Sequence, residues 1–216
     1  EKNRALIAMA RGLIEAREEI LQANEADVKQ GRDKGMSSSL LDRLMLSPQR
    51  IREMAEGLEA VAALPDPIGE AIEMSRRPNG LEIGKIRVPL GVVGIIYESR
   101  PNVTADAAGL CLKTGNAIIL RGGSEAFNSN RAIARALSAA ASAAGVHSGA
   151  IQLVDTTDRE AVNILMKMNR YVDVLIPRGG AGLIQTVVQQ AAVPVIQTGV
   201  GNCHIFVDAD ADLGMA

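Results

Sequence analysis

The sequence predicts an α/β protein in which an open parallel sheet follows an amino-terminal helical layer and a β-hairpin. Three observations predict this fold. Apolar residues recur at helical spacing through the first 63 residues, and two alternating segments then flank the dipeptide Asn79-Gly80. Beyond residue 88, continuous apolar runs alternate with helical stretches in four successive repeats. Since short connections join these repeats, we expect parallel strands with helices packed on the sheet.

The amino-terminal layer is expected to consist of helices with one buried face. Residues 1 to about 30 carry apolar positions at helical spacing with charges between them, and a second helical stretch runs from about 38 to 63. Within the second stretch, Ser47 followed by Pro48 indicates a new helix start, because serine caps free N–H groups and proline fits the first turn. The alternating segments around the Asn-Gly pair predict a hairpin over residues 72–88.

The remaining chain is expected to form the parallel sheet and its helices. Its apolar runs are typical of strands that are buried on both faces. The expected strands span residues 91–97, 117–120, 151–154, 172–176, 193–196 and 203–207. The expected helices span residues 103–112, 124–144, 159–168 and 181–190. We therefore divide the chain into a helical layer plus hairpin, residues 1–88, and a sheet domain, residues 89–216.

The composition excludes several functional classes. The 23 basic and 25 acidic residues are interspersed and give a formal net charge of -2, so the basic excess of a nucleic-acid-binding protein is absent. No apolar run is long enough to span a membrane, and the first residues do not resemble a signal peptide. Two cysteines are too few for a disulfide framework. We expect a cytoplasmic protein without nucleic-acid or membrane partners.

Polar segments follow five of the expected strands. Ligands of open parallel sheets bind beyond the carboxyl ends of the strands. The segments begin at Tyr97, Arg121, Asp155, Pro177 and Gln197. Because five separate segments agree on one edge, we expect the ligand site there.

Two of these segments have the same arrangement of residues. Arg121-Gly122-Gly123-Ser124 and Arg178-Gly179-Gly180 each place an arginine before a glycine pair and a helix start. Glycines let the backbone approach a phosphate, helix N–H groups point at it, and arginine adds charged hydrogen bonds. Each pair alone is equally consistent with ordinary turn chemistry, and neither segment is a dinucleotide fingerprint or a Walker loop. Together they favour a phosphate-bearing ligand.

Three further residues have both a structural and a functional interpretation. Asn102 is either a helix cap or an amide donor for a developing oxyanion. Cys203 begins an apolar strand, where burial is the common fate of a cysteine, and His204 points to the opposite face. A Cys–His dyad is therefore not expected there, and we do not assign Cys203 as a nucleophile.

Four long motifs resemble the γ-glutamyl phosphate reductases, a family within the aldehyde dehydrogenase superfamily. They are residues 88–104, 110–125, 175–183 and 201–205, in that order. The resemblance covers essentially the whole chain. It implies a Rossmann-like open parallel sheet of the aldehyde dehydrogenase type, with residues 1–88 in the cofactor and oligomerisation region and residues 89–216 as the NADPH-binding domain.

The resemblance also implies a reaction. Members of the family are oxidoreductases of proline biosynthesis that reduce γ-glutamyl 5-phosphate to glutamate 5-semialdehyde with NADPH and release phosphate. A cysteine thiolate attacks the acyl phosphate, and hydride reduces the resulting thioester. The implied ligands are NADPH and γ-glutamyl phosphate. The implied protein partners are further copies of the chain in a homo-oligomer and, functionally, glutamate 5-kinase.

Residue roles follow from the same resemblance. Asn102 matches the asparagine that helps to hold the oxyanion. Arg121, Ser124 and Glu125 match the segment that holds the adenosine ribose, where an arginine suits a 2′-phosphate. Arg178, Gly179 and Gly180 match the segment that faces the pyrophosphate. The remaining expected cofactor residues are Glu98, Ser99, Arg100 and Gly122. No metal ligands are expected.

One element of the family pattern is missing from this chain. The nucleophilic cysteine of the family lies in a later segment, beyond the strand that ends near Val207, and Cys203 does not match it. We therefore expect the catalytic domain to lie outside this chain, and the chain alone to show no turnover. The alternatives are a non-catalytic nucleotide- or phosphate-binding module with the same sheet and, more weakly, an oligomerisation scaffold built on the hairpin.

Overall fold

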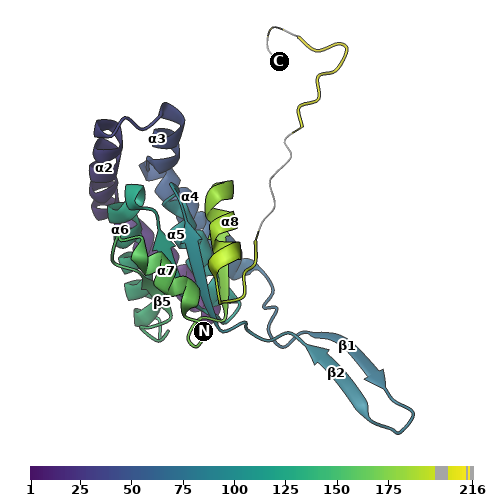
Figure 1. Cartoon of the computed structure of the whole chain (residues 1–216). Coiled ribbons are helices and arrows are strands. Elements are labelled where there is room, and N and C mark those ends of the chain that lie inside the picture. The colour runs from purple at the N-terminus through teal and green to yellow at the C-terminus, as the bar shows by residue number, and fades with distance from the viewer. Residues whose placement is uncertain (198–203, 213, 215–216) are drawn as a thin grey trace.

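The centre of the molecule is a four-stranded parallel sheet, which the computed structural model shows together with its covering helices (Figure 1). The structure describes residues 1–197, 204–212 and 214. The strands lie in the order β5-β4-β3-β6. Their bounds are β3 (Val92–Tyr97), β4 (Ala117–Gly122), β5 (Ile151–Leu153) and β6 (Val174–Arg178). The predicted α/β fold with a parallel sheet is confirmed.

Helices cover both faces of this sheet. One face packs on α5 (Asn102–Lys113) and α6 (Phe127–Ala143), and the other packs on α7 (Glu160–Lys167) and α8 (Ala181–Gln190). The side chains of β3 alternate accordingly, with Ile95 in the first cluster and Ile96 in the second. Burial on both faces explains why the strand sequences are apolar throughout.

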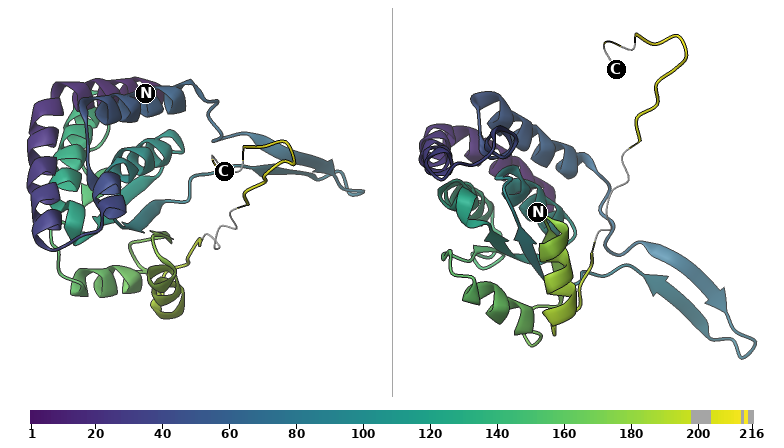
Figure 2. Two further views of the ribbon diagram at one scale, coloured as in Figure 1. Left: turned by 90° about the horizontal axis from the view of Figure 1, so that it is seen from above. Right: turned by 45° about the horizontal axis from the view of Figure 1, so that its top comes forward.

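The amino-terminal helices form an outer layer on the first face (Figure 2). They are α1 (Lys2–Glu15), α2 (Arg17–Asp33), α3 (Ser38–Leu44) and α4 (Pro48–Ala63). Helices α1 and α4 pack on each other and against α5 and α6, and their buried side chains belong to the same apolar cluster as the sheet. The division of the chain at residue 88 stays a prediction, since this cluster includes residues from both sides of it.

The predicted helix start at Ser47 is confirmed. The Ser47 hydroxyl accepts a hydrogen bond from the Arg50 N–H at 3.1 Å, and Pro48 occupies the first helical position of α4. The helical spacing over residues 1 to about 30 corresponds to two helices, with a break at Ala16. Tertiary packing decides this break, because α1 lies along α4 while α2 turns toward α3 and α6.

The hairpin is confirmed and projects away from the body of the molecule (Figure 1). Strands β1 (Ala71–Arg76) and β2 (Glu82–Ile86) pair antiparallel, and every residue of both is exposed. Gly80 adopts a φ of +85°, the left-handed conformation that glycine supplies in such turns.

Two expected strands are not formed as predicted. Residues 193–196 contribute only one parallel bridge, from Val195 to Leu175, and residues 204–207 are not in a strand. A strand needs a hydrogen-bonding neighbour, and Ile205 and Phe206 are each 87% exposed instead of lying against the sheet. Cys203 lies outside the described residues, so no structural statement applies to it. Among the helices that the structure describes, none is long and apolar enough to cross a membrane.

Candidate functional site

The predicted ligand edge forms where three strands end in register. In the two parallel pairings of β3, Tyr97 is opposite Gly122 of β4 on one side and Arg178 of β6 on the other. The Tyr97 hydroxyl is hydrogen-bonded to Thr104 of α5 at 2.7 Å, and Thr104 bonds Asn130 of α6 at 3.1 Å. This buried chain of hydrogen bonds holds the end of β3 to both helices that begin beside it.

A cavity of about 430 Å³, the strand-end cavity, opens at this edge. Six of the predicted cofactor residues line it: Glu98, Ser99, Arg100, Arg178, Gly179 and Gly180. Leu40 and Arg43 of α3 complete the lining together with Val103. Segments that are about 80 residues apart in the sequence therefore meet in one concave surface.

The Glu98 carboxylate binds the amino terminus of α8. Its Oε2 accepts a hydrogen bond from the Gly180 N–H at 2.9 Å, and the Glu98 N–H donates to the Arg178 carbonyl at 3.2 Å. A Cβ atom on Gly179 would lie 2.5 Å from the same carboxylate oxygen, so the glycine permits this close approach. The carboxylate thus occupies one N–H group, that of Gly180, at the helix start where the sequence predicted a phosphate.

A second carboxylate shapes the loop after β3. Both the N–H and the hydroxyl of Ser99 donate to Glu125 Oε1, at 2.7 and 2.9 Å. Ser99 has a φ of +46°, which is uncommon for a residue with a side chain and is held by these two bonds. Glu125 lies in η1 (Ser124–Ala126), so it links the segments after β3 and β4.

Arg121 lies in the protein interior and is absent from the strand-end cavity. It is only 6% exposed, and its guanidinium donates to the carbonyl oxygens of Gly122, Thr157 and Asp158, the last two at 3.3 and 3.2 Å. Burial lowers its pKa, against the opposing effect of Glu125 and of other nearby acidic groups. The arginine connects the end of β4 to the loop after β5 through these hydrogen bonds. No local sequence pattern predicts this contact.

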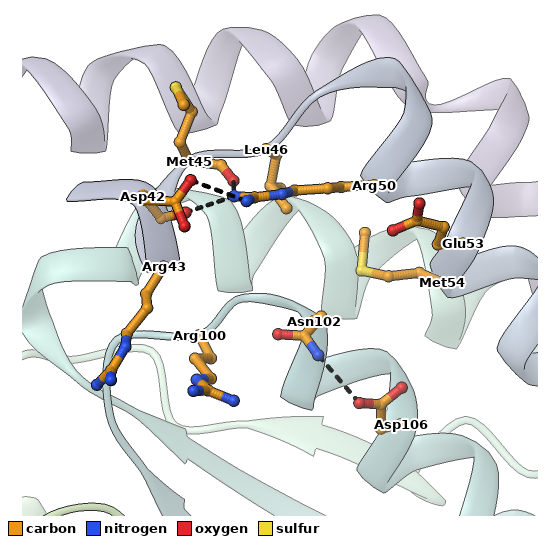
Figure 3. A pocket seen from close by; sticks show the side chains of 10 residues that line it. All are labelled: Asp42, Arg43, Met45, Leu46, Arg50, Glu53, Met54, Arg100, Asn102 and Asp106. Atoms are coloured by element: carbon orange, nitrogen blue, oxygen red, sulfur yellow. Dashed lines mark hydrogen bonds and ion pairs between the residues drawn. The ribbon is translucent and has the colours of Figure 1, made fainter. Parts of the chain in front are cut away.

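Asn102 lines a second cavity, of about 360 Å³, between α5 and the corner of α3 and α4 (Figure 3). It is the first residue of α5, whose cap position is occupied by Pro101, and its Nδ2 donates to Asp106 Oδ2 at 3.2 Å. We name this space the Asn102 cavity. An asparagine amide has two N–H donors, and this contact uses one of them.

The corner of α3 and α4 is held by Arg50. Its guanidinium pairs with Asp42 at 2.9 Å and donates to the Met45 carbonyl at 2.6 Å (Figure 3). Asp42, Met45 and Arg50 all line the Asn102 cavity. None of the site residues expected from the sequence lies in α3 or α4, and the only signal in these two helices is their content of charged residues.

Asp106 of the Asn102 cavity is an exposed residue with a raised carboxyl pKa. The surrounding protein desolvates its carboxyl and raises its pKa, although the Asn102 amide and the charge of Arg178 oppose the shift. Between the ordinary value of 3.8 and the raised value, the folded protein holds a proton that the unfolded chain releases. The contribution of Asp106 to the free energy of unfolding therefore falls as pH rises through that window.

We expect Asp106→Asn to raise the free energy of unfolding relative to wild type at neutral pH and to change it least in acid. Urea titrations at about pH 3 and about pH 7 measure the difference. Asp33, an exposed aspartate of α2 outside this cavity, serves as the control in an Asp33→Asn variant. An Asp106→Asn effect that is equal at both pH values would contradict the raised pKa.

The described residues contain neither a reactive thiol nor a metal cluster. Cys111 is buried in α5, and burial raises the pKa of its thiol to about 11, so the thiolate is scarce at neutral pH. No group of three His, Cys, Asp or Glu side chains in the described part of the chain is arranged to hold a metal ion.

Comparison with known proteins agrees with this geometry. Residues 3–216 match the model of the aldehyde dehydrogenase family. The γ-glutamyl phosphate reductase of Moorella thermoacetica is 68% identical over 216 residues, which are 100% of this chain and 52% of that protein. That of Heliobacterium modesticaldum is 69% identical over 215 residues, with the same coverage. The chain thus spans about half the length of the curated relatives that it matches.

Solved structures share the fold. The crystal structure of γ-glutamyl phosphate reductase from Thermotoga maritima gives a TM-score of 0.91 at 49% identity, covering 99% of this chain and 52% of that one. The corresponding structure from Saccharomyces cerevisiae gives 0.80 at 31% identity, covering 98% and 55%. The resemblance inferred from the four sequence motifs is confirmed, and this chain belongs to the aldehyde dehydrogenase family.

Proposed function

We propose that this chain supplies the cofactor-binding part of an enzyme that reduces γ-glutamyl 5-phosphate to glutamate 5-semialdehyde with NADPH in proline biosynthesis. One observation carries the proposal. The strand-end cavity and the Asn102 cavity adjoin each other and have Arg43 and Arg100 in common. A dinucleotide at the strand ends would therefore lie next to the amide that is suited to a developing oxyanion. The relatives from Moorella thermoacetica and Heliobacterium modesticaldum are γ-glutamyl phosphate reductases, a name that specifies the same substrate.

The strand-end cavity fits the phosphate-bearing part of a nicotinamide cofactor. Gly179 and Gly180 keep the backbone open to close approach, the N–H groups of α8 point at this space, and the exposed Arg178 adds a positive charge. When bound, NADPH supplies the hydride. An incoming phosphate competes with the Glu98 carboxylate for the Gly180 N–H, so Glu98 has to move away for that contact to form.

The preference for NADPH over NADH rests on the family resemblance. Arg121 is the residue proposed for the 2′-phosphate. Its guanidinium donates hydrogen bonds to three backbone carbonyls. In this arrangement it acts as a positioning residue for the loop that contains Thr157 and Asp158. Gly122, Ser124 and Glu125 belong to the same proposed ribose segment, and Glu125 acts there through its two bonds to Ser99.

In the proposed reaction Asn102 stabilises negative charge on the substrate carbonyl oxygen. Asp106 accepts one amide N–H and orients the group, so that the second N–H is available to the oxyanion. The nucleophile is assigned outside the described residues, because Cys111 is a buried thiol with a raised pKa. The chain alone is accordingly proposed to lack turnover. We also propose that the protein assembles into a homo-oligomer, associates with glutamate 5-kinase and is located in the cytoplasm.

The test is the reverse reaction of the full-length protein that carries this chain. Glutamate 5-semialdehyde, NADP⁺ and inorganic phosphate are mixed, and NADPH formation is followed by its absorbance. We expect a rate that requires phosphate, and no rate from the present chain alone. Cofactor binding without phosphate-dependent turnover in the full-length protein would instead support a non-catalytic nucleotide-binding module.

A further inference from the structure

Two arginines lie at the junction of the two cavities. Arg43 of α3 and Arg100 of the loop between β3 and α5 are the residues that line both the Asn102 cavity and the strand-end cavity. Figure 3 shows their side chains next to each other, both directed away from the Asp42–Arg50 pair. Two separate segments of the chain therefore bring two guanidinium groups to one place.

The acidic groups around this junction are already engaged. Asp42 pairs with Arg50 at 2.9 Å, and Asp106 accepts from Asn102 at 3.2 Å. Glu53 accepts from Gln49 at 3.1 Å, and Glu98 accepts from Gly180 at 2.9 Å. Every carboxylate that lines either cavity thus has a partner.

The two arginines have no such partner. Within the part of the chain that the structure describes, neither Arg43 nor Arg100 forms an ion pair. Both guanidinium groups are therefore available to an anion, and their forks match the oxygen atoms of a phosphoryl group.

We propose that Arg43 and Arg100 bind the phosphoryl group of the acyl phosphate substrate, which gives Arg100 a role other than the cofactor contact expected from the sequence. This inference rests on the proposed function. The phosphoryl group is bonded to the carbonyl whose oxygen Asn102 is proposed to stabilise, and Arg100 is two residues from Asn102 in the sequence. The α-carboxylate of the same substrate lies at the far end of its carbon chain. The group nearest to the reacting carbon is therefore the anion that this junction is placed to receive.

The arginines would act when phosphate leaves. A thiolate forms a bond to the carbonyl carbon, and the bond from that carbon to the phosphate oxygen breaks, with its electron pair remaining on phosphate. Two guanidinium groups at that oxygen offset the charge that phosphate gains. In the reverse direction the same groups hold inorganic phosphate for attack on the thioester.

Steady-state kinetics of the full-length protein in the reverse direction test this assignment. We expect Arg43→Ala and Arg100→Ala each to raise the KM for inorganic phosphate about 10-fold to 100-fold, because each removes a charge-assisted contact. The KM for glutamate 5-semialdehyde is expected to stay within about twofold. Arg43→Lys and Arg100→Lys, which keep the charge and lose the fork, should lie between alanine and wild type.

The matched control is Arg52→Ala. Arg52 is an exposed arginine of α4 that lines neither cavity, and its removal should leave both KM values unchanged. An unchanged KM for phosphate in the Arg43 and Arg100 variants would overturn the assignment. So would a rise in the KM for the semialdehyde alone, which would assign the two arginines to the α-carboxylate.

Calorimetric titration with inorganic phosphate separates this inference from the proposed function. We expect the full-length wild type to bind phosphate and the folded Arg43→Ala/Arg100→Ala double variant to bind it at least about tenfold more weakly. An active wild type whose double variant binds phosphate normally would refute the inference alone. Loss of binding in the double variant of a protein that shows no turnover would refute the reaction and keep the anion site.

Discussion

Replacing Asn102 by alanine in the full-length protein is expected to lower kcat about 100-fold to 1,000-fold, the usual cost of one lost oxyanion donor. The amide lies at the start of α5 in the Asn102 cavity, with one N–H on Asp106. Because an oxyanion forms only during the reaction, the KM for NADPH and for substrate should change little. Initial rates over a range of each substrate measure both parameters.

Asp106→Ala provides the matched comparison for this effect. Asp106 orients the amide without touching the oxyanion in the proposed arrangement, so its loss should lower kcat less than the loss of Asn102 itself. A double variant should be no slower than Asn102→Ala, since the two residues act through one group. Normal kcat in Asn102→Ala would remove this asparagine from the proposed mechanism.

Replacing Asp27 by alanine is expected to lower the free energy of unfolding by about 3 kcal/mol. Asp27 is 1% exposed and accepts hydrogen bonds from the N–H and side chain of Asn128 and from the N–H and hydroxyl of Ser129. These donors lie in the first turn of α6, where the positive end of the helix dipole stabilises a carboxylate. Alanine leaves the buried Ser129 donors without an acceptor, and urea unfolding of the chain measures the loss.

Glu25→Ala is the control for Asp27→Ala. Glu25 is an exposed acidic residue of the same helix, so its removal should change the free energy of unfolding by no more than about 0.5 kcal/mol. Asp27→Asn should fall between the two, because it keeps the size and one acceptor of the carboxylate. Equal stability of Asp27→Ala and Glu25→Ala would show that these buried hydrogen bonds contribute nothing.

The region around Asp27 also connects the helical layer to the site. One turn earlier, Asn24 donates to the Leu44 carbonyl at 2.8 Å and to Ser129 at 3.0 Å, and accepts from the Leu46 N–H at 2.7 Å. Leu46 lines the Asn102 cavity. The helical layer therefore fixes one wall of the proposed substrate site, a role that its apolar periodicity did not indicate.

Local sequence signals predicted most of the fold. Ser47-Pro48 marked the start of α4, the Asn-Gly pair marked the hairpin, and apolar runs marked all four strands of the sheet. Each signal acts over a few residues, through capping, turn chemistry or burial. The run at 204–207 shows the limit of such signals, since an apolar run forms a strand only beside a neighbour with free hydrogen-bonding groups. The run at 193–196 bonds to Leu175 of β6 through Pro194 and Ile196 but forms only a single bridge.

The site divides along the same line. The sequence by itself determined that the polar ends of the strands meet at one edge, because parallel strands and short connections leave no other arrangement. Only the tertiary structure decided that Arg121 binds backbone carbonyls, that Glu98 binds the amino terminus of α8, and that Arg43 joins Arg100 between two cavities. Arg121 and Asp158 are 37 positions apart in the sequence, and Glu98 and Gly180 are 82 positions apart. Local propensity carries no information about contacts over such separations. The pairing of β4 with β5 and of β3 with β6 brings the first two pairs of residues together, and the packing of the helical layer on the sheet places Arg43 beside Arg100.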